Sequence, residues 1–384
     1  MHRYLFSLLS AIPFAVIPCG ACAAGPVGGY YTEDRALESP VFGPTGYNQF
    51  AISVAISDGI AIVGAARVAG PGNAYLYDSK TGALLHTLSP ANDSASNFGR
   101  TVAIEGKYAV VGSDQATYVY DANNYQLLHT LPRSFGLDID NGRVLIGGSG
   151  VYDLSSGQRF AQIGAGGTSA ALSGDFAVIG YVGNEGGVPA YAVVFDWKAG
   201  RYLYDLATAG TPNGFGISVD ADGNIAVVGS VGDQGGSAYV FDLRTGQELH
   251  RLEEIGRIYQ PYRSFGYAVT MHGDIAIVGA YERSDYFPVG PGGQMEYVFE
   301  YGAAFALSAQ SGEEIARFTT AGPTTGGLAK YGFSLDYDGS QLIAGTLGWP
   351  KKAYVTDFAI PEPTALLLLV SFGLISLAHS PRRY

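Results

Sequence analysis

The stretch that most clearly suggests chemistry is a long segment, rich in tyrosine and charged residues, that begins at residue 281. It contains Tyr281, Glu282, Arg283, Asp285 and Tyr286. Aromatic rings stack on the apolar faces of sugar rings, and carboxylates and guanidinium groups hydrogen-bond to the hydroxyls around them. These residue types therefore predict a weak carbohydrate-binding surface. The alternative is that the tyrosines only pack the segment against itself.

Two residues of the preceding connection, Tyr262 and Arg263, would extend this surface if the loops gather on one face. The carboxylates of the segment also allow a catalytic hypothesis, in which Glu282, Asp285 or Glu296 serve as acid and base. A retaining glycosidase would need two carboxyl groups about 5 Å apart in a cleft.

Three Asp-x-Asp pairs raise the question of calcium. These pairs are Asp138-x-Asp140, Asp220-x-Asp222 and Asp336-x-Asp338. Calcium takes about six to eight oxygen ligands, which a long loop can wrap around the ion. Each pair here adjoins a turn of only two residues, so we interpret the aspartates as hairpin-turn residues. We expect no cofactor and no metal site; calcium stays open as an alternative that the loop lengths do not support.

Three histidines occupy the same position in similar stretches. His86 and His129 each lie in Leu-His-Thr-Leu, and His250 lies in Leu-His-Arg-Leu. If each stretch is the outer strand of a separate blade, the three imidazoles are far apart. We therefore expect exposed strand positions rather than a shared metal.

Composition limits the class of protein. The chain has 384 residues with 34 acidic and 22 basic side chains, a net charge of −12. Nucleic-acid binding requires a basic face, so this charge argues against it. The 55 glycines, 27 tyrosines and only 15% charged residues suit many short strands joined by tight turns. The length without a linker indicates a repeat architecture.

A unit of four short strands recurs along the chain, most clearly over residues 214–252. Phe215-Gly216 opens this copy, Asp222-Gly223 turns the chain, and the apolar run 225–228 predicts a strand buried on both faces. Comparable apolar runs, each ending in glycine, lie at 60–64, 109–112, 144–147, 176–180, 225–229, 275–279 and 342–345. The period is that expected of propeller blades.

The aromatic-Gly pair followed by a Ser-Val-Ala-Ile-x-x-Gly-x-Ala-Ile-Val-Gly-Ala pattern resembles FG-GAP repeats, the blades of integrin-α-like β-propellers. The pairs begin at Phe98, Phe135, Phe215, Phe265 and Tyr331, while unit one has Phe50-Ala51 and unit four lacks the pair. The resemblance covers residues 47–358. It implies an all-β, seven-bladed β-propeller of four-stranded antiparallel blades, with seven repeats in one domain.

The seventh unit supplies three strands and then meets Pro361, so its fourth strand is missing. The segment 36–40 is similar to residues 85–90, the end of the first outer strand. We expect residues near 35–38, within an N-terminal segment 25–46, to pair with the third strand of blade seven and close the ring.

Residues 1–24 have the order of a secretory signal peptide, with basic His2 and Arg3, an apolar run over 4–17 and small residues at 21–24. This predicts an N-terminal signal helix and secretion through the Sec pathway. Cys19 and Cys22 both lie in this segment. A mature chain without them has no thiol for a disulfide, a metal or a nucleophile.

The C-terminal residues 359–384 resemble the PEP-CTERM sorting signal of Gram-negative bacteria. The three parts are Pro361-Glu362-Pro363, an uncharged run over 365–378, and Arg382-Arg383. The resemblance implies processing by an exosortase-type enzyme, a short hydrophobic transmembrane helix that holds the membrane transiently, and export coupled to extracellular polysaccharide. The destination is then the cell envelope or the extracellular space.

These features favour an exported, non-enzymatic propeller of the cell surface or extracellular matrix that binds exopolysaccharide or a surface protein. Two other hypotheses stay open. One is a glycan-active enzyme that uses the carboxylates of the long segment. The other is a purely structural matrix component.

Overall fold

The computed structural model of the chain describes residues 29–32, 34–40, 48–67, 70–90, 96–164, 166–183, 189–212, 214–232, 235–253, 264–282, 285–289, 294–298, 302–319, 330–347 and 351–360. The regular structure in these ranges is β-strand, numbered β1 to β31. Within them no helix is long and apolar enough to cross a bilayer. The helices expected near the two ends of the chain lie outside the described residues.

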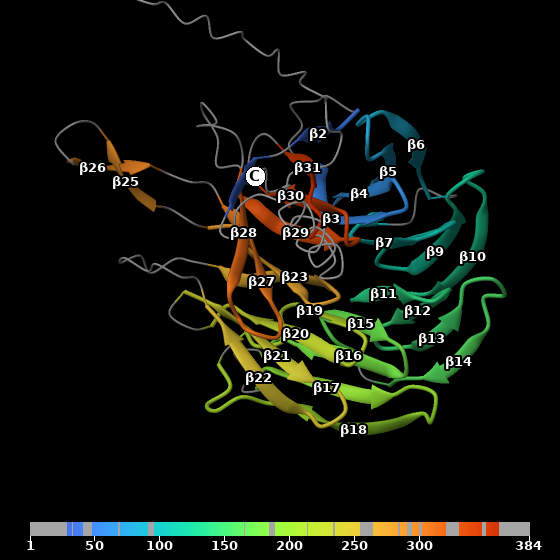
Figure 1. Ribbon diagram of the computed structural model, residues 1–384. Helices are drawn as coiled ribbons and strands as arrows, with labels where there is room; N and C mark the ends of the chain where they lie inside the picture. Colours follow the sequence, from blue (N-terminus) through green and yellow to red (C-terminus); the bar gives the residue numbers. More distant parts are fainter. Residues whose placement is uncertain are drawn as a thin grey trace, which may run out of the picture.

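Seven four-stranded antiparallel blades surround one axis (Figure 1), which confirms the predicted propeller. In each blade the first strand lies innermost and chain order runs outward, except that a strand from the N-terminal segment forms the outer edge of blade 7. Blades 1 to 3 are β3 (Asn48–Ser57), β4 (Ile60–Arg67), β5 (Asn73–Asp78), β6 (Leu84–Leu88); β7 (Thr101–Glu105), β8 (Tyr108–Gly112), β9 (Ala116–Asp121), β10 (Leu127–Pro132); and β11 (Leu137–Asp140), β12 (Arg143–Ile146), β13 (Gly150–Asp153), β14 (Arg159–Gln162).

Blades 4 to 7 continue the pattern. They are β15 (Ser169–Ser173), β16 (Phe176–Tyr181), β17 (Tyr191–Asp196), β18 (Arg201–Leu206); β19 (Val219–Asp222), β20 (Ile225–Ser230), β21 (Ser237–Asp242), β22 (Gln247–Leu252); β23 (Phe265–His272), β24 (Ile275–Ala280), β27 (Ala303–Ser308), β28 (Glu314–Thr319); and β29 (Tyr331–Tyr337), β30 (Gln341–Thr346), β31 (Lys352–Asp357), β2 (Arg35–Glu38).

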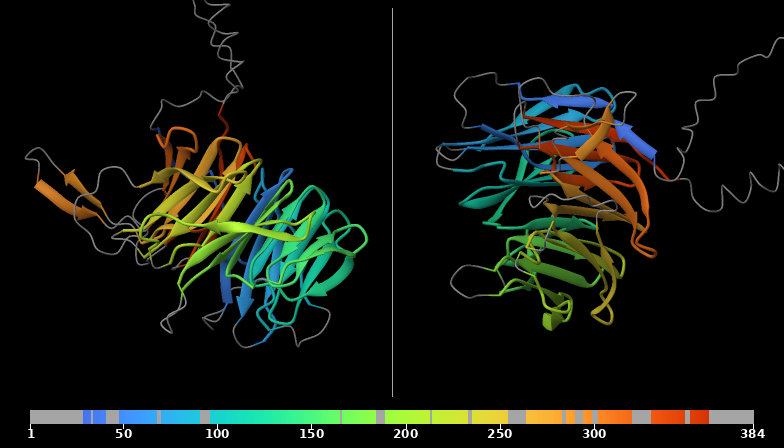
Figure 2. Two further views of the ribbon diagram at one scale, coloured as in Figure 1. Left: turned by 90° about the horizontal axis from the view of Figure 1, so that it is seen from below. Right: turned by 90° about the vertical axis from the view of Figure 1, so that its left-hand side faces the viewer.

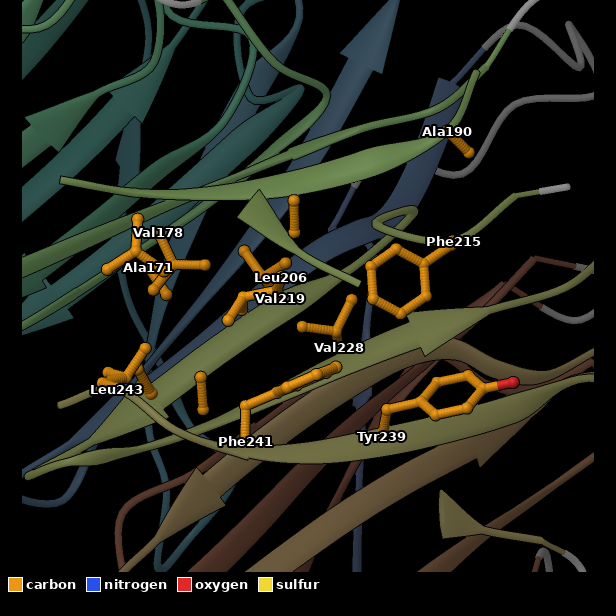
Figure 3. Packing of buried hydrophobic residues seen from close by; sticks show 14 residues of the cluster. Ala171, Val178, Ala190, Leu206, Phe215, Val219, Val228, Tyr239, Phe241 and Leu243 are labelled. Carbon is orange, nitrogen blue, oxygen red and sulfur yellow. The ribbon is translucent and has the colours of Figure 1, made fainter. Parts of the chain in front are cut away.

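The hydrophobic core is divided among the interfaces between neighbouring blades. One cluster of buried apolar side chains lies at each interface around the ring. Figure 3 shows the cluster between blades 4 and 5, which unites Val178 of β16 with Phe215 and with Val228 of β20. Because both faces of a blade are covered, its second strand is a continuous apolar run rather than an alternating one.

At five of the seven interfaces, the glycine near the end of the second strand allows neighbouring blades to approach closely. A Cβ at Gly229, in β20, would lie 1.9 Å from the carbonyl oxygen of Gly266, which belongs to the aromatic-Gly pair of blade 6. Gly266 has a φ of 89°, a left-handed conformation that aims this carbonyl at blade 5. The same approach recurs where Gly64 meets Gly99. The glycine of the second strand in one blade therefore contacts the glycine of the aromatic-Gly pair in the next blade.

Ring closure follows the predicted pairing. Strand β2 pairs antiparallel with β31, with Arg35 opposite Val355 and Glu38 opposite Lys352. Arg35 forms an ion pair with Asp357 at 2.5 Å, and Lys352 forms one with Glu38 at 2.6 Å. Leu37 is fully buried in the cluster between blades 7 and 1. Strand β2, which lies within the expected closing segment 25–46, therefore completes blade 7.

A second N-terminal strand was not predicted. Strand β1 (Gly29–Thr32) pairs in parallel with β28 and adds a fifth strand to blade 6. Tyr31 of β1 stacks on Phe318 at 5.4 Å and meets the edge of Phe358 at 5.5 Å. The start of the propeller domain therefore holds blades 6 and 7 together.

Two local expectations are corrected. The Phe135-Gly136 pair does not open blade 3 as Phe215-Gly216 opens blade 5, because Gly147 bonds to Gly136 where Gly229 bonds to Ser218. Blade 3 is therefore two residues shorter at its start. The first hairpin of blade 5 turns at Gly223 and Asn224, one residue later than predicted.

The long segment after blade 6 strand β24 contains a hairpin of its own. Strands β25 (Asp285–Val289) and β26 (Gln294–Val298) pair antiparallel and form a separate two-stranded sheet. Figures 1 and 2 show this hairpin projecting from the side of the propeller.

Substitution of Gly229 by alanine tests the interface between blades. We expect Gly229→Ala to lower the free energy of unfolding by about 3 kcal/mol, because the new Cβ meets a backbone carbonyl that cannot move without its blade. Gly164→Ala is the matched control, since a Cβ there has no atom within 4 Å, and we expect a change within about 0.5 kcal/mol. Urea denaturation measures both, and equal effects would contradict the close approach.

Truncation of Leu37 tests ring closure. We expect Leu37→Ala to cost about 2–5 kcal/mol, as for any leucine in a closed core. Glu38→Ala on the same strand removes an exposed ion pair and should cost less than about 1 kcal/mol. The midpoint temperatures of thermal unfolding compare the stabilities of the two variants. A Leu37→Ala protein as stable as Glu38→Ala would argue against β2 as an integral strand of blade 7.

Candidate functional site: the axial channel and its rim

The innermost strands of all seven blades enclose a channel with a cavity of about 540 Å³ along the propeller axis. The first residues of the innermost strands line one end of this channel, and in blades 1, 2, 6 and 7 the lining extends along the strand to its last residues. The channel therefore takes its shape from the most rigidly held strands of the fold.

Seven side chains, one from each blade, form what we call the channel rim. Each lies one position before the residue opposite the glycine of the second strand, where the first strand begins. The rim residues are Ile52, Arg100, Phe135, Thr168, Ile217, Tyr267 and Phe333. Most of them present an apolar or aromatic surface to the channel.

Blades 6 and 7 bring three aromatic rings together at this rim. The ring of Tyr267 lies 4.6 Å from that of Tyr281 and 4.9 Å from that of Phe333, and Tyr281 and Phe333 are 5.4 Å apart. Lys330 lies 5.1 Å from the Tyr281 ring and forms an ion pair with Glu282 at 2.8 Å. We call these five residues the aromatic corner. All five are half-buried, so each keeps an exposed part.

Burial also affects the hydroxyl of Tyr267. Desolvation raises the pKa of this phenol, and the neighbouring Tyr281 and the carboxylate of Glu282 raise it further. The aromatic corner therefore presents a neutral phenol as a hydrogen-bond donor beside one charged pair.

The structure unites only part of the predicted sugar-binding surface. Tyr281 and Glu282 lie in the aromatic corner, whereas Asp285 and Tyr286 are in strand β25 of the projecting hairpin and Glu296 is in β26. Predicted residues outside the described ranges are Tyr262, Arg263, Arg283, Pro361, Glu362, Pro363, Arg382 and Arg383. Tyr267, Phe333 and Lys330 were not predicted from the sequence. Tyr267 and Phe333 each directly follow the aromatic-Gly pair of their blade, whereas Lys330 directly precedes that of blade 7.

The Asp-x-Asp pairs connect blades and are not primarily turn residues. Asp138 Oδ2 accepts the backbone N–H of Leu172 in blade 4 at 2.7 Å. Asp220 accepts that of Met271 in blade 6, and Asp336 that of Ile56 in blade 1, both at 2.7 Å. We call Asp138, Asp220 and Asp336 the channel aspartates. Each bonds to the innermost strand of the following blade.

In two of the pairs, the second aspartate also accepts a backbone N–H of the following blade, two residues after the one bonded to the first aspartate. Asp140 accepts the N–H of Gly174 at 2.8 Å, and Asp222 accepts that of Gly273 at 2.7 Å. Asp338 instead accepts the N–H of Ser340 in its own turn. The hairpin-turn interpretation therefore holds for Asp338 and is wrong for the channel aspartates.

The channel aspartates hold their protons more tightly than ordinary carboxyl groups. Desolvation raises the pKa of Asp138 well above the usual range, and the charge of Asp220 raises it further. Desolvation likewise raises the pKa of Asp220 to about 6 and that of Asp336 to about 7. Backbone N–H bonds act in the opposite direction but do not offset the loss of water.

The histidines of the outer strands contact neighbouring blades. The ring of His86, in β6, stacks on Tyr125 of blade 2 with centroids 4.1 Å apart. His129 Nε2, in β10, lies 3.1 Å from the carbonyl oxygen of Ser155 in blade 3. His250 lies on β22. Among the described residues, no group of three or more His, Cys, Asp or Glu side chains is placed to hold a metal ion.

The channel aspartates predict a pH dependence of stability. The native Asp336 carboxyl keeps its proton up to about pH 7, whereas the ordinary pKa is 3.8. The native state therefore binds more protons in this window, so the free energy of unfolding falls as the pH rises from 4 to 7. Asp336→Asn keeps an acceptor for Ile56 but cannot ionise, and we expect a flatter profile by urea denaturation.

Asp78→Asn is the control for this profile. Hydrogen bonds from Thr81 lower the pKa of the exposed Asp78, so its titration falls below the window. We expect the decline between pH 4 and 7 to persist in Asp78→Asn. If the free energy of unfolding of Asp336→Asn falls with pH as steeply as that of the natural chain, the decline comes from other groups.

Comparisons with known proteins support the architecture. No known protein family and no curated protein matches the sequence. In structure the chain is similar to the hydrazine synthase of Kuenenia stuttgartiensis, with a TM-score of 0.58 and 13% identity over 84% of this chain and 99% of that one. It is also similar to KlHsv2 with loop 6CD replaced by a Gly-Ser linker, with a TM-score of 0.51 and 10% identity over 78% and 90%. At such identities the likeness shows the fold alone.

Proposed function

We propose that this protein is an exported, non-enzymatic β-propeller that binds extracellular polysaccharide at the aromatic corner. The observation that supports this most is the grouping of Tyr267, Tyr281 and Phe333 with the Glu282–Lys330 ion pair at the mouth of a channel. Half-exposed rings offer flat apolar faces to a sugar, and the charged pair offers hydrogen bonds to its hydroxyls.

The cellular address in this proposal comes from the sequence patterns at the two ends. Residues 1–24 would direct the chain through the Sec pathway. Pro361-Glu362-Pro363 and Arg382-Arg383 support a PEP-CTERM protein that an exosortase-type enzyme processes in a Gram-negative bacterium. The FG-GAP-like repeats over residues 47–358 lie between the two terminal signals. The C-terminal hydrophobic run would hold the membrane only transiently before release to the envelope or matrix.

Binding to the producing cells' own exopolysaccharide tests the proposal. We expect Tyr281→Ala combined with Phe333→Ala to weaken binding about tenfold, because each stacked ring contributes ~0.5–1.5 kcal/mol beyond its buried area. Phe160→Ala is the matched control, since Phe160 lies on the outer strand β14 and is 57% exposed. Co-sedimentation with and without calcium measures the affinity.

The same assay separates the alternatives. Failure of the natural protein to bind would overturn the proposal and favour a surface-protein partner or a purely structural role. Equal binding by all variants would place the contact elsewhere on the propeller. Release of reducing sugar during the incubation would favour the glycan-active enzyme.

A further inference from the structure

We propose that the axial channel is a second, end-on site that receives the terminal unit of a glycan bearing a protonated amine. The sugar ring would lie against Phe135, which belongs to blade 3 and not to the aromatic corner of blades 6 and 7, and its ammonium group would face the channel aspartates. The inference rests on the proposed function in taking the ligand to be a glycan. It adds a different site and a specific ligand class.

The dimensions of the channel suit a small polar unit. Its cavity of about 540 Å³ falls within the roughly 300–1,000 Å³ of ligand pockets. The walls are the first strands of the blades, whose backbones are bonded to the neighbouring blades. A site on such strands is preformed, so binding does not require the ordering of a loop.

Phe135 gives the rim an aromatic surface that packing does not explain. The aromatic residues that open blades 2, 5 and 6 are fully buried, namely Phe98, Phe215 and Phe265, whereas Phe135 is 39% exposed. The two-residue shortening of blade 3 moves this ring from the core to the channel rim. The guanidinium of Arg133 lies over the ring, 4.3 Å from its centroid. Because an exposed phenylalanine contributes little to folding, its place at the rim suits ligand contact.

The channel aspartates are not required to build the propeller. At the same strand position, blades 1, 2 and 4 have Ala55, Ala103 and Ala171, and these blades are complete. Each carboxylate has about four acceptor positions, and at Asp138 the backbone N–H groups of Leu172 and Ile139 occupy two of them. The remaining positions can accept hydrogen bonds from an ammonium group.

Charge in the channel favours a cationic ligand. Apart from the channel aspartates, the titratable side chains that line it are Arg100, Glu105, Tyr267, His272 and Asp338. Arg100 lies at the rim, 3.6 Å from Asp114. A uronic acid would meet like charge in a poorly hydrated space, whereas an ammonium would replace the protons that these carboxyls retain. Binding of the cation should therefore release protons and strengthen between pH 5 and 7.

The test uses the full propeller and defined oligosaccharides in isothermal titration calorimetry. We expect glucosamine oligomers to bind at pH 7, N-acetylglucosamine oligomers to bind at least tenfold more weakly, and galacturonate oligomers not to bind. Titration in two buffers of different ionisation enthalpy should reveal proton release. Phe135→Ala and Asp220→Asn should each weaken glucosamine binding about tenfold, whereas Phe160→Ala should leave it unchanged.

Spermidine separates the two sources of an ammonium group. If the ligand is a glycan, Phe135→Ala weakens oligomer binding but not spermidine binding, because spermidine has no ring to stack. If Phe135→Ala instead binds the oligomers and spermidine as the natural protein does, or weakens the binding of both equally, the glycan assignment is overturned. Circular dichroism of Asp220→Asn checks that the propeller remains folded, and the exposed Phe135 offers a variant that does not disturb the core.

Two outcomes separate this inference from the proposed function. If exopolysaccharide binding depends on Tyr281 and Phe333 but Phe135→Ala and Asp220→Asn bind glucosamine oligomers like the natural protein, the channel site is overturned and the proposed function stands. If the exopolysaccharide does not bind but glucosamine oligomers bind through Phe135 and Asp220, the channel site stands and the proposed polysaccharide function fails.

Discussion

The propeller depends on how it satisfies the open edge of each innermost strand. Such a strand bonds to one neighbour in its own blade, which leaves half of its backbone groups without a partner in the sheet. Side chains of the preceding blade supply these partners. Ser218, Asp220 and Asp222 lie on one face of β19 and bond in turn to Gly266, Met271 and Gly273 of blade 6. This ladder fixes the spacing between two blades, and its repetition around the ring fixes their arrangement.

The ladder is built with different chemistry around the ring. Blade 1 uses Ser53 and Ser57, and blade 2 uses Glu105, so neutral and charged groups both serve. A carboxylate in the channel wall costs far more free energy to desolvate than a serine hydroxyl does. The three channel aspartates therefore bond to the next blade at a higher desolvation cost than the serines of blade 1 do. The bonds between blades are thus required by the fold, whereas the negative charge of the channel aspartates is not.

Local patterns in the sequence predicted most of the fold. The glycine of the second strand, the aromatic-Gly pair and the missing strand of blade 7 each depend on residues close together in the chain, and they gave the blade count and the closing strand. The roles of Asp138, Asp220 and Asp336 depend on a backbone in the next blade, so their spacing alone suggested a turn. The aromatic corner joins residues from two blades, and only Tyr281 and Glu282 lay in a segment unusual enough to attract notice. Strand β1 pairs in parallel at an edge, which leaves no alternation or turn to recognise.

Closure by the two ends of the domain also determines when folding is completed. Arg35 and Asp357 are 322 positions apart, so β2, made near the start of the chain, waits for β31, the last strand to be made. At roughly 5–20 residues per second, that interval is on the order of tens of seconds. Until then the ring is open, with the unpaired strand β2 at one end and an incomplete seventh blade at the other. These ends are complementary within one chain and between chains, so the local protein concentration decides between a closed monomer and strand-exchanged oligomers.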